Sequence, residues 1–402
     1  MDYSSLFINL LALSKKMIQS KLLDIIPGKK NPKVKELISK TGALDMALNE
    51  TNFPCPDKLI DLSIKYLKTN CNTNSSSDGV FKLREEISRM MSIKFSHKFN
   101  PETEITITAG HVQAVHSTIS TFVKNDDEVI IIEPTNESIV PSILLNGGKV
   151  VYFQLKSPSF RIEWEELRMI ITAKTSMIII NTPNDSTGCV FSEKDMLQLQ
   201  KLTNGTNIVI LSLESYGSFY NNIAPQSVAK YENLIKRSII ISDFGPYFNI
   251  NGWMMGYCLG PEDLMSQFRE IQQIHIKKVN IPLQYALANY LPLCNKSTDD
   301  LSQTYQGKRN YFNRLMENTK YKILPAEGGY FEMIDYSDVS DEDDLDFVKR
   351  MAIDYGVVVY PSSAFYHEKT KLKYVRICFI KENDKLEKAA NAFLKMQKTS
   401  EK

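Results

Sequence analysis

The chain has 402 residues, of which 43% are hydrophobic and 24% are charged, so it can bury a large core and is long enough for two domains. Lysine and arginine total 48, and aspartate and glutamate total 47, which leaves a formal net charge of +1. A balance this close to neutral supplies no long-range field for nucleic acid or an anionic membrane, so we expect neither as a partner. The six cysteines form no Cys-x-x-Cys pair and have no histidine at metal-ligand spacing. We therefore expect no metal site, no disulfide framework and a cytoplasmic location.

The first patterned segment is an apolar run at residues 6–13 (LFINLLAL). It is far shorter than the roughly 20 residues that span a bilayer, and it lacks the basic stretch and cleavage site of a signal peptide. Leucine and methionine recur at helical spacing through residues 3–26, which predicts an amphipathic helix that packs on the rest of the chain or on a partner.

Short runs rich in β-branched residues follow one another through the middle of the chain. These runs are 129–133 (VIIIE), 150–154 (VVYFQ), 177–181 (MIIIN), 208–213 (IVILSL) and 238–242 (SIIIS). Near-continuous apolar runs are typical of parallel strands that are buried on both faces, and a spacing of roughly 30 residues fits βαβ units. The middle of the chain therefore predicts an α/β domain with a mostly parallel sheet.

After residue 285 the pattern changes to longer helical stretches and three further apolar runs, at 329–335, 357–360 and 375–380. They indicate a separate, smaller α+β layer. The polar stretch 70–79 predicts a loop, and the acidic stretch 337–346 predicts a turn that opens a helix. The expected domains are an N-terminal extension (1–27), the N-terminal arm of a small domain (28–60), a large α/β domain (61–288) and a small C-terminal domain (289–402).

Six motifs occur where ligands of α/β sheets collect or in the C-terminal layer. They are 79–84 (GVFKLR), 181–188 (NTPNDSTG), 244–257 (FGPYFNINGWMMGY), 327–337 (EGGYFEMIDYS), 359–366 (VYPSSAFY) and 374–379 (YVRICF). In this order they resemble the class I/II aminotransferases of the fold-type-I pyridoxal-phosphate superfamily, and they are similar in particular to the kynurenine and methionine aminotransferase branch. The resemblance runs from about residue 20 to the C-terminus. It implies a homodimer with a mostly parallel, seven-stranded sheet in a large domain and a smaller α+β domain.

The resemblance breaks down at the positions that hold the cofactor. The Schiff-base lysine of the family is matched by Pro246, which has no side-chain amine. The carboxylate that keeps the pyridine nitrogen of the cofactor protonated is matched by Leu213, and strand alternation points the adjacent Glu214 the other way. In the phosphate cradle, Val112 stands for a hydroxyl residue and Met254 for a basic one.

Other cofactor positions are matched by polar or ionisable residues. Asp185 replaces the asparagine at the ring hydroxyl, and Asn136 replaces the aromatic residue that stacks on the ring. Asp243 replaces a phosphate-binding serine, Asn74 replaces the tyrosine that a partner subunit supplies, and His111 enters the phosphate cradle. Two like charges about 4 Å apart repel by about 4 kcal/mol at an effective dielectric constant near 20, so a carboxylate there opposes phosphate binding. We therefore expect that pyridoxal phosphate is lost and that the chain uses no cofactor.

Two functional positions of the family are retained. Arg376 matches the arginine that grips the substrate α-carboxylate, a task that suits the guanidinium fork, and Tyr216 matches the tyrosine near the ring hydroxyl. With Asn136, Asn181 and Asn74, Arg376 forms the predicted substrate-binding set. The alternatives are an ion pair at a domain interface for Arg376 and a buried tyrosine with one hydrogen-bond partner for Tyr216.

The candidate catalytic residues are His111, Asp185, Tyr216 and Asp243. His111 either acts as a general base or satisfies a local hydrogen bond. Asp185 and Asp243 either pair as acid and base or are two solvated carboxylates. Lys277 and Lys278 either replace the missing positive charge or are solvated surface residues.

Three functions stay open. In the first, the cleft without its cofactor binds a small carboxylate-bearing ligand of amino-acid or acyl type, as a binder or as a cofactor-independent biosynthetic enzyme. The second is a pseudoenzyme with an assembly role, as a homodimer or beside a partner enzyme. The third is an atypical pyridoxal-phosphate-dependent aminotransferase with a displaced lysine. Polar replacements in the cleft favour the first, and the apolar residues at 112, 213, 246 and 254 favour the second. The joint loss of ring, phosphate and Schiff-base contacts opposes the third.

Overall fold

The computed structural model of the chain describes residues 34–48, 53–69, 76–135, 139–220, 224–294, 297–368 and 372–400. The helix predicted at 3–26 lies outside these residues, as do Asn74 and Asn136. Within the described ranges, no helix combines the length and the apolar character that crossing a bilayer requires.

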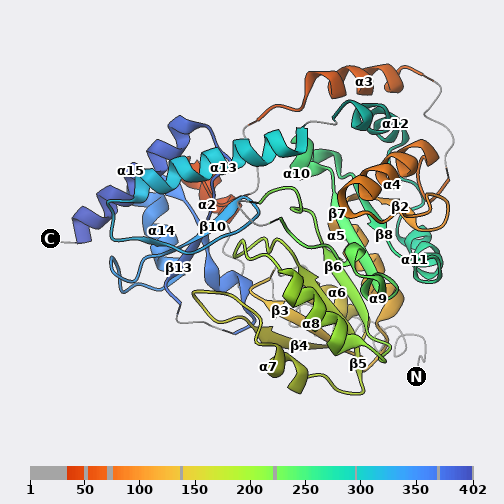
Figure 1. The fold of residues 1–402 in the computed structure, drawn as a ribbon. Coiled ribbons are helices and arrows are strands. Elements are labelled where there is room, and N and C mark those ends of the chain that lie inside the picture. Colours follow the sequence, from red (N-terminus) through yellow and green to blue (C-terminus); the bar gives the residue numbers. More distant parts are fainter. Residues whose placement is uncertain are drawn as a thin grey trace, which may run out of the picture.

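The central element is a seven-stranded sheet (Figure 1). Its strands are β2 (Ile105–Thr108), β3 (Glu128–Glu133), β4 (Lys149–Gln154), β5 (Thr175–Asn181), β6 (Val209–Leu213), β7 (Ser238–Asp243) and β8 (Gly256–Leu259). They lie in the order β2-β8-β7-β6-β5-β3-β4, and β8 runs opposite to the other six strands. The mostly parallel α/β sheet expected from the sequence is confirmed.

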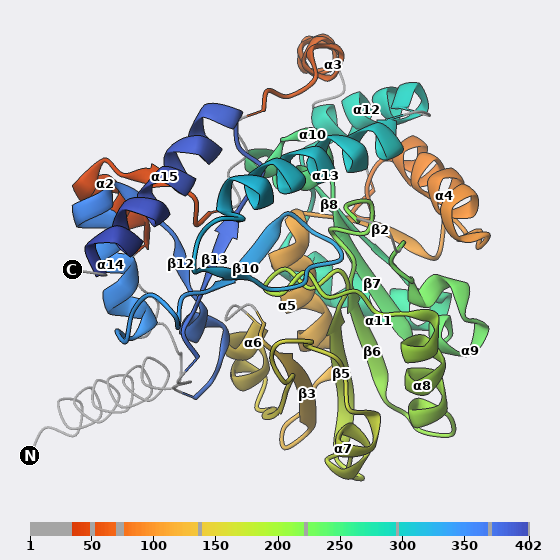
Figure 2. The ribbon, with the colours of Figure 1, turned by 60° about the vertical axis from the view of Figure 1, so that its left-hand side comes forward.

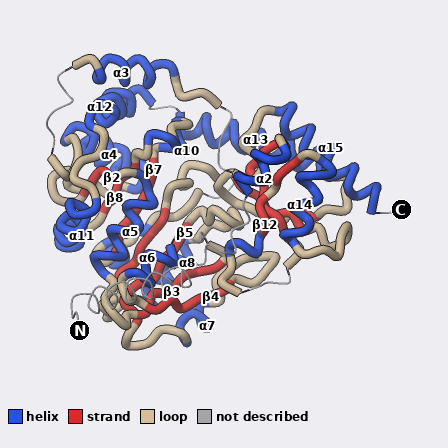
Figure 3. Tube along the Cα trace, turned by 180° about the vertical axis from the view of Figure 1, so that it is seen from behind, coloured by secondary structure: helices blue, strands red, loops and turns tan. Residues whose placement is uncertain are grey.

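Helices enclose this sheet on both faces, as Figure 3 shows. On one face lie α5 (Gly110–Phe122), α6 (Ile139–Leu145) and α11 (Glu262–His275); on the other lie α4 (Phe81–Phe95), α8 (Glu193–Thr203), α9 (Glu232–Ile235) and α12 (Ile281–Tyr290). Alternate strand residues supply the two apolar cores, because successive side chains of a strand point to opposite faces. Along β5, for example, Met177 and Ile179 belong to the core that includes α5, whereas Ile178 and Ile180 belong to the core that includes α4 and α8.

Short elements connect or flank this domain. They are α3 (Asp57–Leu67), which packs on α12, α7 (Trp164–Met169), α10 (Gly245–Phe248) and the 3-10 turns η3 (Val228–Lys230), η4 (Asn251–Trp253) and η5 (Leu291–Cys294).

The rest of the described chain forms a smaller α+β domain (Figure 2). Its main sheet contains β9 (Lys322–Ile323), β10 (Phe331–Asp335), β12 (Tyr360–Pro361) and β13 (Tyr374–Cys378), all antiparallel, in the order β12-β13-β10-β9. A parallel pair joins β1 (Leu44–Asp45) of the N-terminal arm to β11 (Val357–Val358). The helical elements are α2 (Val34–Thr41), α13 (Ser297–Met316), α14 (Asp344–Tyr355), α15 (Asn383–Ser400) and the 3-10 turn η6 (Ser362–Phe365). In both views α13 extends from near α15 to near α10, so it bridges the two domains.

Several expectations about these elements can now be compared with the structure. The run 357–360 is not one strand, because Val357 and Val358 pair with β1 whereas Tyr360 and Pro361 pair with β13. Pro361 has no amide to donate, which fits its place on an edge strand. The acidic stretch 337–346 does open a helix, since the side chain of Asp343 accepts a hydrogen bond from Asp346 N and caps α14. The exact domain limits stay predictions.

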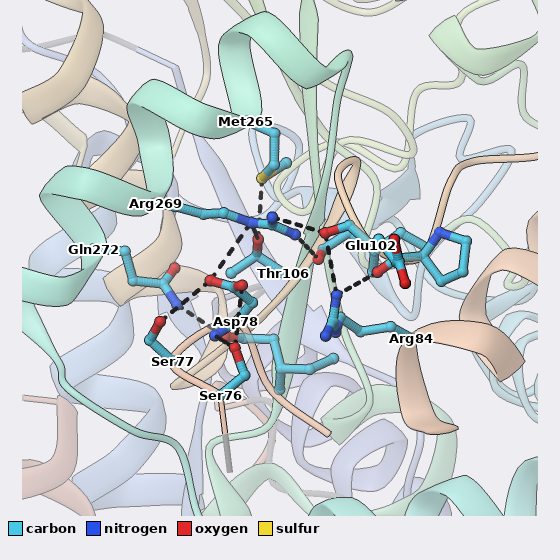
Figure 4. Close-up of polar contacts among 12 residues, drawn as sticks. Ser76, Ser77, Asp78, Arg84, Glu102, Thr106, Met265, Arg269 and Gln272 are labelled. Carbon is cyan, nitrogen blue, oxygen red and sulfur yellow. Dashed lines mark hydrogen bonds and ion pairs between the residues drawn. The ribbon is translucent and has the colours of Figure 1, made fainter. Parts of the chain in front are cut away.

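A polar network holds β2 against α11 (Figure 4). Arg269 on α11 donates through Nε to Thr106 Oγ1 (2.8 Å), through Nη1 to Glu102 O (2.8 Å) and through Nη2 to Ile105 O (2.7 Å). The Asp78 carboxylate lies 3.6 Å from Arg269 Nε. This ion pair connects the turn before α4 to α11. Each nitrogen of the guanidinium therefore has an acceptor, and the contacts join three segments that are distant in sequence.

We expect Arg269→Met to lower the free energy of unfolding by about 1–2 kcal/mol, because it leaves backbone acceptors of β2 without their donor. Urea denaturation measures this change. Arg168→Met is the matched control, since Arg168 is exposed and its side chain pairs with Glu165, three residues earlier on the same helix. Equal stability of the two variants would contradict a stabilising role for the network.

Candidate functional site

The sequence-predicted site residues gather at one edge of the large sheet. Strands β2, β3, β5, β6 and β7 run in the same direction, since β8 is antiparallel to both of its neighbours. Their carboxyl ends therefore share an edge, where α/β proteins bind ligands. His111 follows β2, Asp185 follows β5, Tyr216 follows β6 and Asp243 ends β7.

Asp243 caps the N-terminus of α5. Its Oδ2 accepts a hydrogen bond from His111 N (3.3 Å) and lies 3.6 Å from His111 Nδ1, while its Oδ1 accepts from Gly245 N (2.7 Å). Gly110 has a φ of +75°, a backbone conformation that residues with a Cβ rarely adopt, which favours glycine at the start of α5. The helix end that attracts anions is thus already in contact with a carboxylate of the chain itself.

Two apolar side chains at cofactor positions of the family are exposed. Val112 is 46% exposed and Met254 is 51% exposed. Met254 also has a φ of +52°, which is uncommon for a residue other than glycine. The sheet edge next to α5 therefore exposes apolar side chains to solvent near the His111–Asp243 pair.

Arg376 forms the second part of the site. Its guanidinium carbon lies 3.9 Å from the ring centroid of Phe331, 4.6 Å from Phe365 and 5.0 Å from Tyr360. Nη1 donates to the backbone carbonyl of Asp185 (3.0 Å), whereas Nε is buried without a hydrogen-bond partner. Among the described residues Arg376 has no carboxylate within ion-pair distance, and burial lowers its pKa while the nearby Asp185 opposes that change. A buried cation is therefore held by neutral groups.

Tyr216 and Asn181 complete the surroundings of Asp185. Asn181 Nδ2 donates to Asp185 Oδ1 (2.9 Å), and the Tyr216 ring meets Tyr330 edge-on at 4.9 Å. Burial raises the pKa of Tyr216, and the Asp185 carboxylate raises it further, so its hydroxyl stays protonated at ordinary pH. Tyr216 thus offers a hydrogen-bond donor close to Arg376.

The structure does not join Asp185 to Asp243. The ends of β5 and β7 are roughly 10 Å apart, because β6 lies between them. Each carboxylate has other partners, which are Asn181 for Asp185, and His111 and Gly245 for Asp243. An acid–base pair of these two aspartates therefore does not form in this arrangement.

Leu213 and Glu214 point to different surroundings, as strand alternation predicts. Leu213 packs at the edge of the core under α5, whereas Glu214 is buried and accepts hydrogen bonds from Ser212 Oγ (2.7 Å) and Val228 N (3.3 Å). Burial raises the pKa of Glu214, and these hydrogen bonds oppose that change. Pro246 lies buried in the first turn of α10.

Three side chains around Arg376 were missed by the sequence reasoning. Phe331, Tyr360 and Phe365 all fall inside motifs that were recognised, but only the contacts identify them as the rings around the guanidinium. Lys277 and Lys278, which follow α11, are exposed.

Comparison with protein families decides the identity of the fold. The family model for aminotransferase class I and II matches residues 41–393. The chain belongs to this family.

Its relatives are similar over nearly their whole length. The methionine aminotransferase of Escherichia coli is 30% identical over 355 residues, which cover 88% of this chain and 92% of the relative. The kynurenine–oxoglutarate transaminase of Dictyostelium discoideum is 28% identical and covers 90% of this chain and 92% of its own. A solved E. coli protein with methionine aminotransferase function superposes with a TM-score of 0.88 at 29% identity, covering 90% of this chain and 96% of that one.

These relatives correct the expectation that the chain uses no cofactor. Aminotransferases of this family depend on pyridoxal phosphate, so the comparisons indicate that cofactor rather than none, and the expectation is wrong. It was inferred from single positions, which cannot outweigh similarity along nine-tenths of the chain.

The arrangement of the described residues does not fit a phosphate group at the N-terminus of α5. The His111 amide that would face the phosphate donates to Asp243, so an incoming phosphate has to displace a carboxylate. Asp243→Ser should therefore raise the affinity for pyridoxal phosphate by about tenfold, through removal of a like charge.

Fluorescence titration with pyridoxal phosphate measures that affinity. Asp346→Ser is the control, because Asp346 is an exposed aspartate on α14, away from the sheet edge. If Asp243→Ser binds no better than the native chain, the carboxylate does not oppose the phosphate.

Proposed function

We propose that this member of the aminotransferase family binds an amino-acid-type carboxylate on Arg376 and does not transaminate through a lysine at position 246. The observation that carries the proposal is the buried Arg376 guanidinium, which has no carboxylate within ion-pair distance among the described residues and has an Nε without a hydrogen-bond partner.

The surroundings of Arg376 support a carboxylate ligand. A buried cation without a counter-charge is unfavourable, and a bidentate carboxylate is the acceptor that matches a guanidinium. The rings of Phe331, Phe365 and Tyr360 lie over the guanidinium of Arg376. A polar ligand would therefore approach the N–H groups at the edge of the guanidinium. Tyr216 adds a protonated hydroxyl nearby.

The relatives support amino acids and their oxo acids as the ligand class. The names of the two similar proteins refer to methionine, kynurenine and oxoglutarate. Because the E. coli methionine aminotransferase is 30% identical over 88% of this chain, L-methionine is the first probe.

The loss of lysine-dependent chemistry rests on the motif at 244–257. In the resemblance of this motif to the family, position 246 takes the place of the Schiff-base lysine, and proline has no amine to form that bond. Leu213 takes the place of the carboxylate that keeps the pyridine nitrogen protonated. Both replacements support a chain that binds the substrate class without the family's turnover.

A second candidate is an atypical aminotransferase that turns over without a lysine at 246. The similarity of the whole chain to transaminases favours it.

One assay separates the two candidates. The purified chain, supplied with pyridoxal phosphate, L-methionine and 2-oxoglutarate, should form no glutamate above a blank without protein, while the E. coli methionine aminotransferase serves as the positive control. Sustained glutamate formation by the native chain would refute the first candidate and support the second.

We also propose a homodimer and a cytoplasmic location. Members of the family are typically homodimers, and α3 presents Ile60, Ile64 and Leu67, each at least 39% exposed, as apolar surface for a second copy. Cys55, Cys189, Cys258 and Cys378 are free thiols, which suits a reducing compartment. Analytical ultracentrifugation tests the dimer.

A further inference from the structure

A contact between the two domains lies beside the Arg376 site. Glu133 ends β3 of the large domain, and His367 follows η6 of the small domain. Glu133 Oε1 accepts a hydrogen bond from His367 N (2.6 Å), and Glu133 Oε2 lies 2.9 Å from His367 Nδ1. One carboxylate thus binds both the backbone and the side chain of the same residue.

The histidine ring is also held by an aromatic ring of the large domain. It stacks on Tyr152 of β4 with centroids 3.7 Å apart and an interplanar angle of 2°. The Glu133 side chain is 2% exposed, whereas the His367 side chain is 33% exposed. Burial raises the pKa of Glu133, and the contacts with His367 oppose that change, as expected for a carboxylate that relies on this partner.

Two further hydrogen bonds place the segment Ser362–His367 between the domains. On the large-domain side, Thr135 N donates to Phe365 O (3.1 Å). On the small-domain side, Ser363 N donates to Asp344 Oδ2 (2.6 Å) at the start of α14. The segment is therefore anchored at both ends, and its large-domain anchors follow the carboxyl end of β3.

The same segment supplies a wall of the Arg376 site. The Phe365 ring lies 4.6 Å from the guanidinium and stacks on Tyr360 at 5.2 Å. A second set of hydrogen bonds connects Arg376 to the end of β3. Arg376 donates to the backbone carbonyl of Asp185, and the neighbouring residue Asn184 donates through Nδ2 to Pro134 O (3.1 Å), which directly follows β3. A shift of the segment relative to β3 would move Phe365 away from Arg376.

We propose that His367 is a positioning residue, a latch on Glu133 and Tyr152 that fixes the Ser362–His367 segment against the large domain and so sets the geometry of the Arg376 site. The latch goes beyond the proposed function, and its effect on ligand affinity rests on that function. The contact between His367 and Glu133 forms only when the two domains lie against each other. Its loss therefore lowers the fraction of chains in which Phe365 is held next to Arg376.

Three variants test the latch. His367→Ala removes both the ring stack and the side-chain contact with Glu133, whereas His367→Gln keeps a side-chain donor for Glu133 and is expected to rescue part of the effect. His97→Ala is the matched control, since His97 also packs on an aromatic ring, that of Phe99, at a centroid distance of 4.5 Å, but lies outside the Glu133–His367–Tyr152 contact.

The first readout is hydrogen–deuterium exchange of the free protein, which needs no ligand. His367→Ala should speed amide exchange in the peptide that spans 362–368 by about tenfold, with His97→Ala unchanged in that peptide and His367→Gln in between. Exchange in His367→Ala that equals the native rate overturns the latch.

The second readout is the dissociation constant for L-methionine by calorimetric titration. It should rise by about fivefold in His367→Ala and by less in His367→Gln, because a smaller fraction of chains is competent to bind. Faster exchange with unchanged affinity would overturn the link between the latch and Arg376. Absence of L-methionine binding to the native chain would instead refute the proposed function, and the exchange result would still decide on the latch.

Discussion

Arg376→Ala is expected to weaken L-methionine binding by about 100-fold, equivalent to about 3 kcal/mol, because it removes charge-assisted hydrogen bonds to the carboxylate. The rings of Phe331, Phe365 and Tyr360 remain in this variant, so the change isolates the guanidinium. Calorimetric titration of native and variant protein measures the ratio of the dissociation constants.

Two further variants show whether the weaker binding comes from the loss of the guanidinium at position 376. Arg376→Lys keeps a positive charge but not the planar fork, so we expect an affinity between those of the native chain and of Arg376→Ala. Arg168→Ala removes an exposed arginine on α7 and should leave binding unchanged. A native-like affinity in Arg376→Ala would mean that the carboxylate binds elsewhere.

Pro246→Lys is expected to produce a covalent adduct with pyridoxal phosphate where the native chain forms none at this position. The variant places an amine in the first turn of α10, next to the end of β7, where the family resemblance puts the Schiff-base lysine. The measurements are a visible absorbance band, its loss on borohydride reduction, and mass spectrometry of the peptide that contains position 246.

Pro282→Lys is a matched control for that gain. Pro282 is also a buried proline in the first turn of a helix, α12, and no adduct is expected there. Because Asp243 contacts the N-terminus of α5, the double variant Pro246→Lys with Asp243→Ser should form the adduct at lower cofactor concentration. If neither variant forms an adduct, position 246 does not correspond to the lysine of the family.

Much of the fold could be predicted from the sequence, because parallel strands that are buried on both faces appear in it as nearly continuous apolar runs. The five apolar runs in the middle of the chain became β3 to β7, with ends that differ by at most two residues. The antiparallel strand β8 and its partner β2 were not predicted as strands, since both are only four residues long. The β8 sequence GYCL contains no β-branched residue, and β2 (ITIT) is shorter than each of the five runs that were predicted. Val357–Tyr360 was misread for another reason, because partners distant in sequence divide it between two sheets.

For the candidate site, the sequence predicted individual positions but not which of them lie close together. Strand order decides which positions meet, and it places β6 between the strands that lead to Asp185 and Asp243. The aromatic surroundings of Arg376 depend on contacts between β10, β12, η6 and β13, which no local pattern encodes. Glu133 was visible as the polar end of an apolar run, but its partner His367 lies 234 residues away.

The cofactor expectation failed because it treated each replaced position as independent. Pro246, Leu213 and Asp243 each argue against one contact, yet the family match extends over residues 41–393 and the relatives use pyridoxal phosphate. What this chain does with that cofactor therefore depends on the chemistry at positions 243 and 246.

A crystal structure of the native protein with L-methionine tests the central claim most directly. We predict that the α-carboxylate lies about 3 Å from the guanidinium nitrogens of Arg376, at the edge of the guanidinium, since the rings of Phe331 and Phe365 lie over its faces. L-methionine bound elsewhere, with the Arg376 N–H edge facing only the carbonyls of the chain, would contradict it.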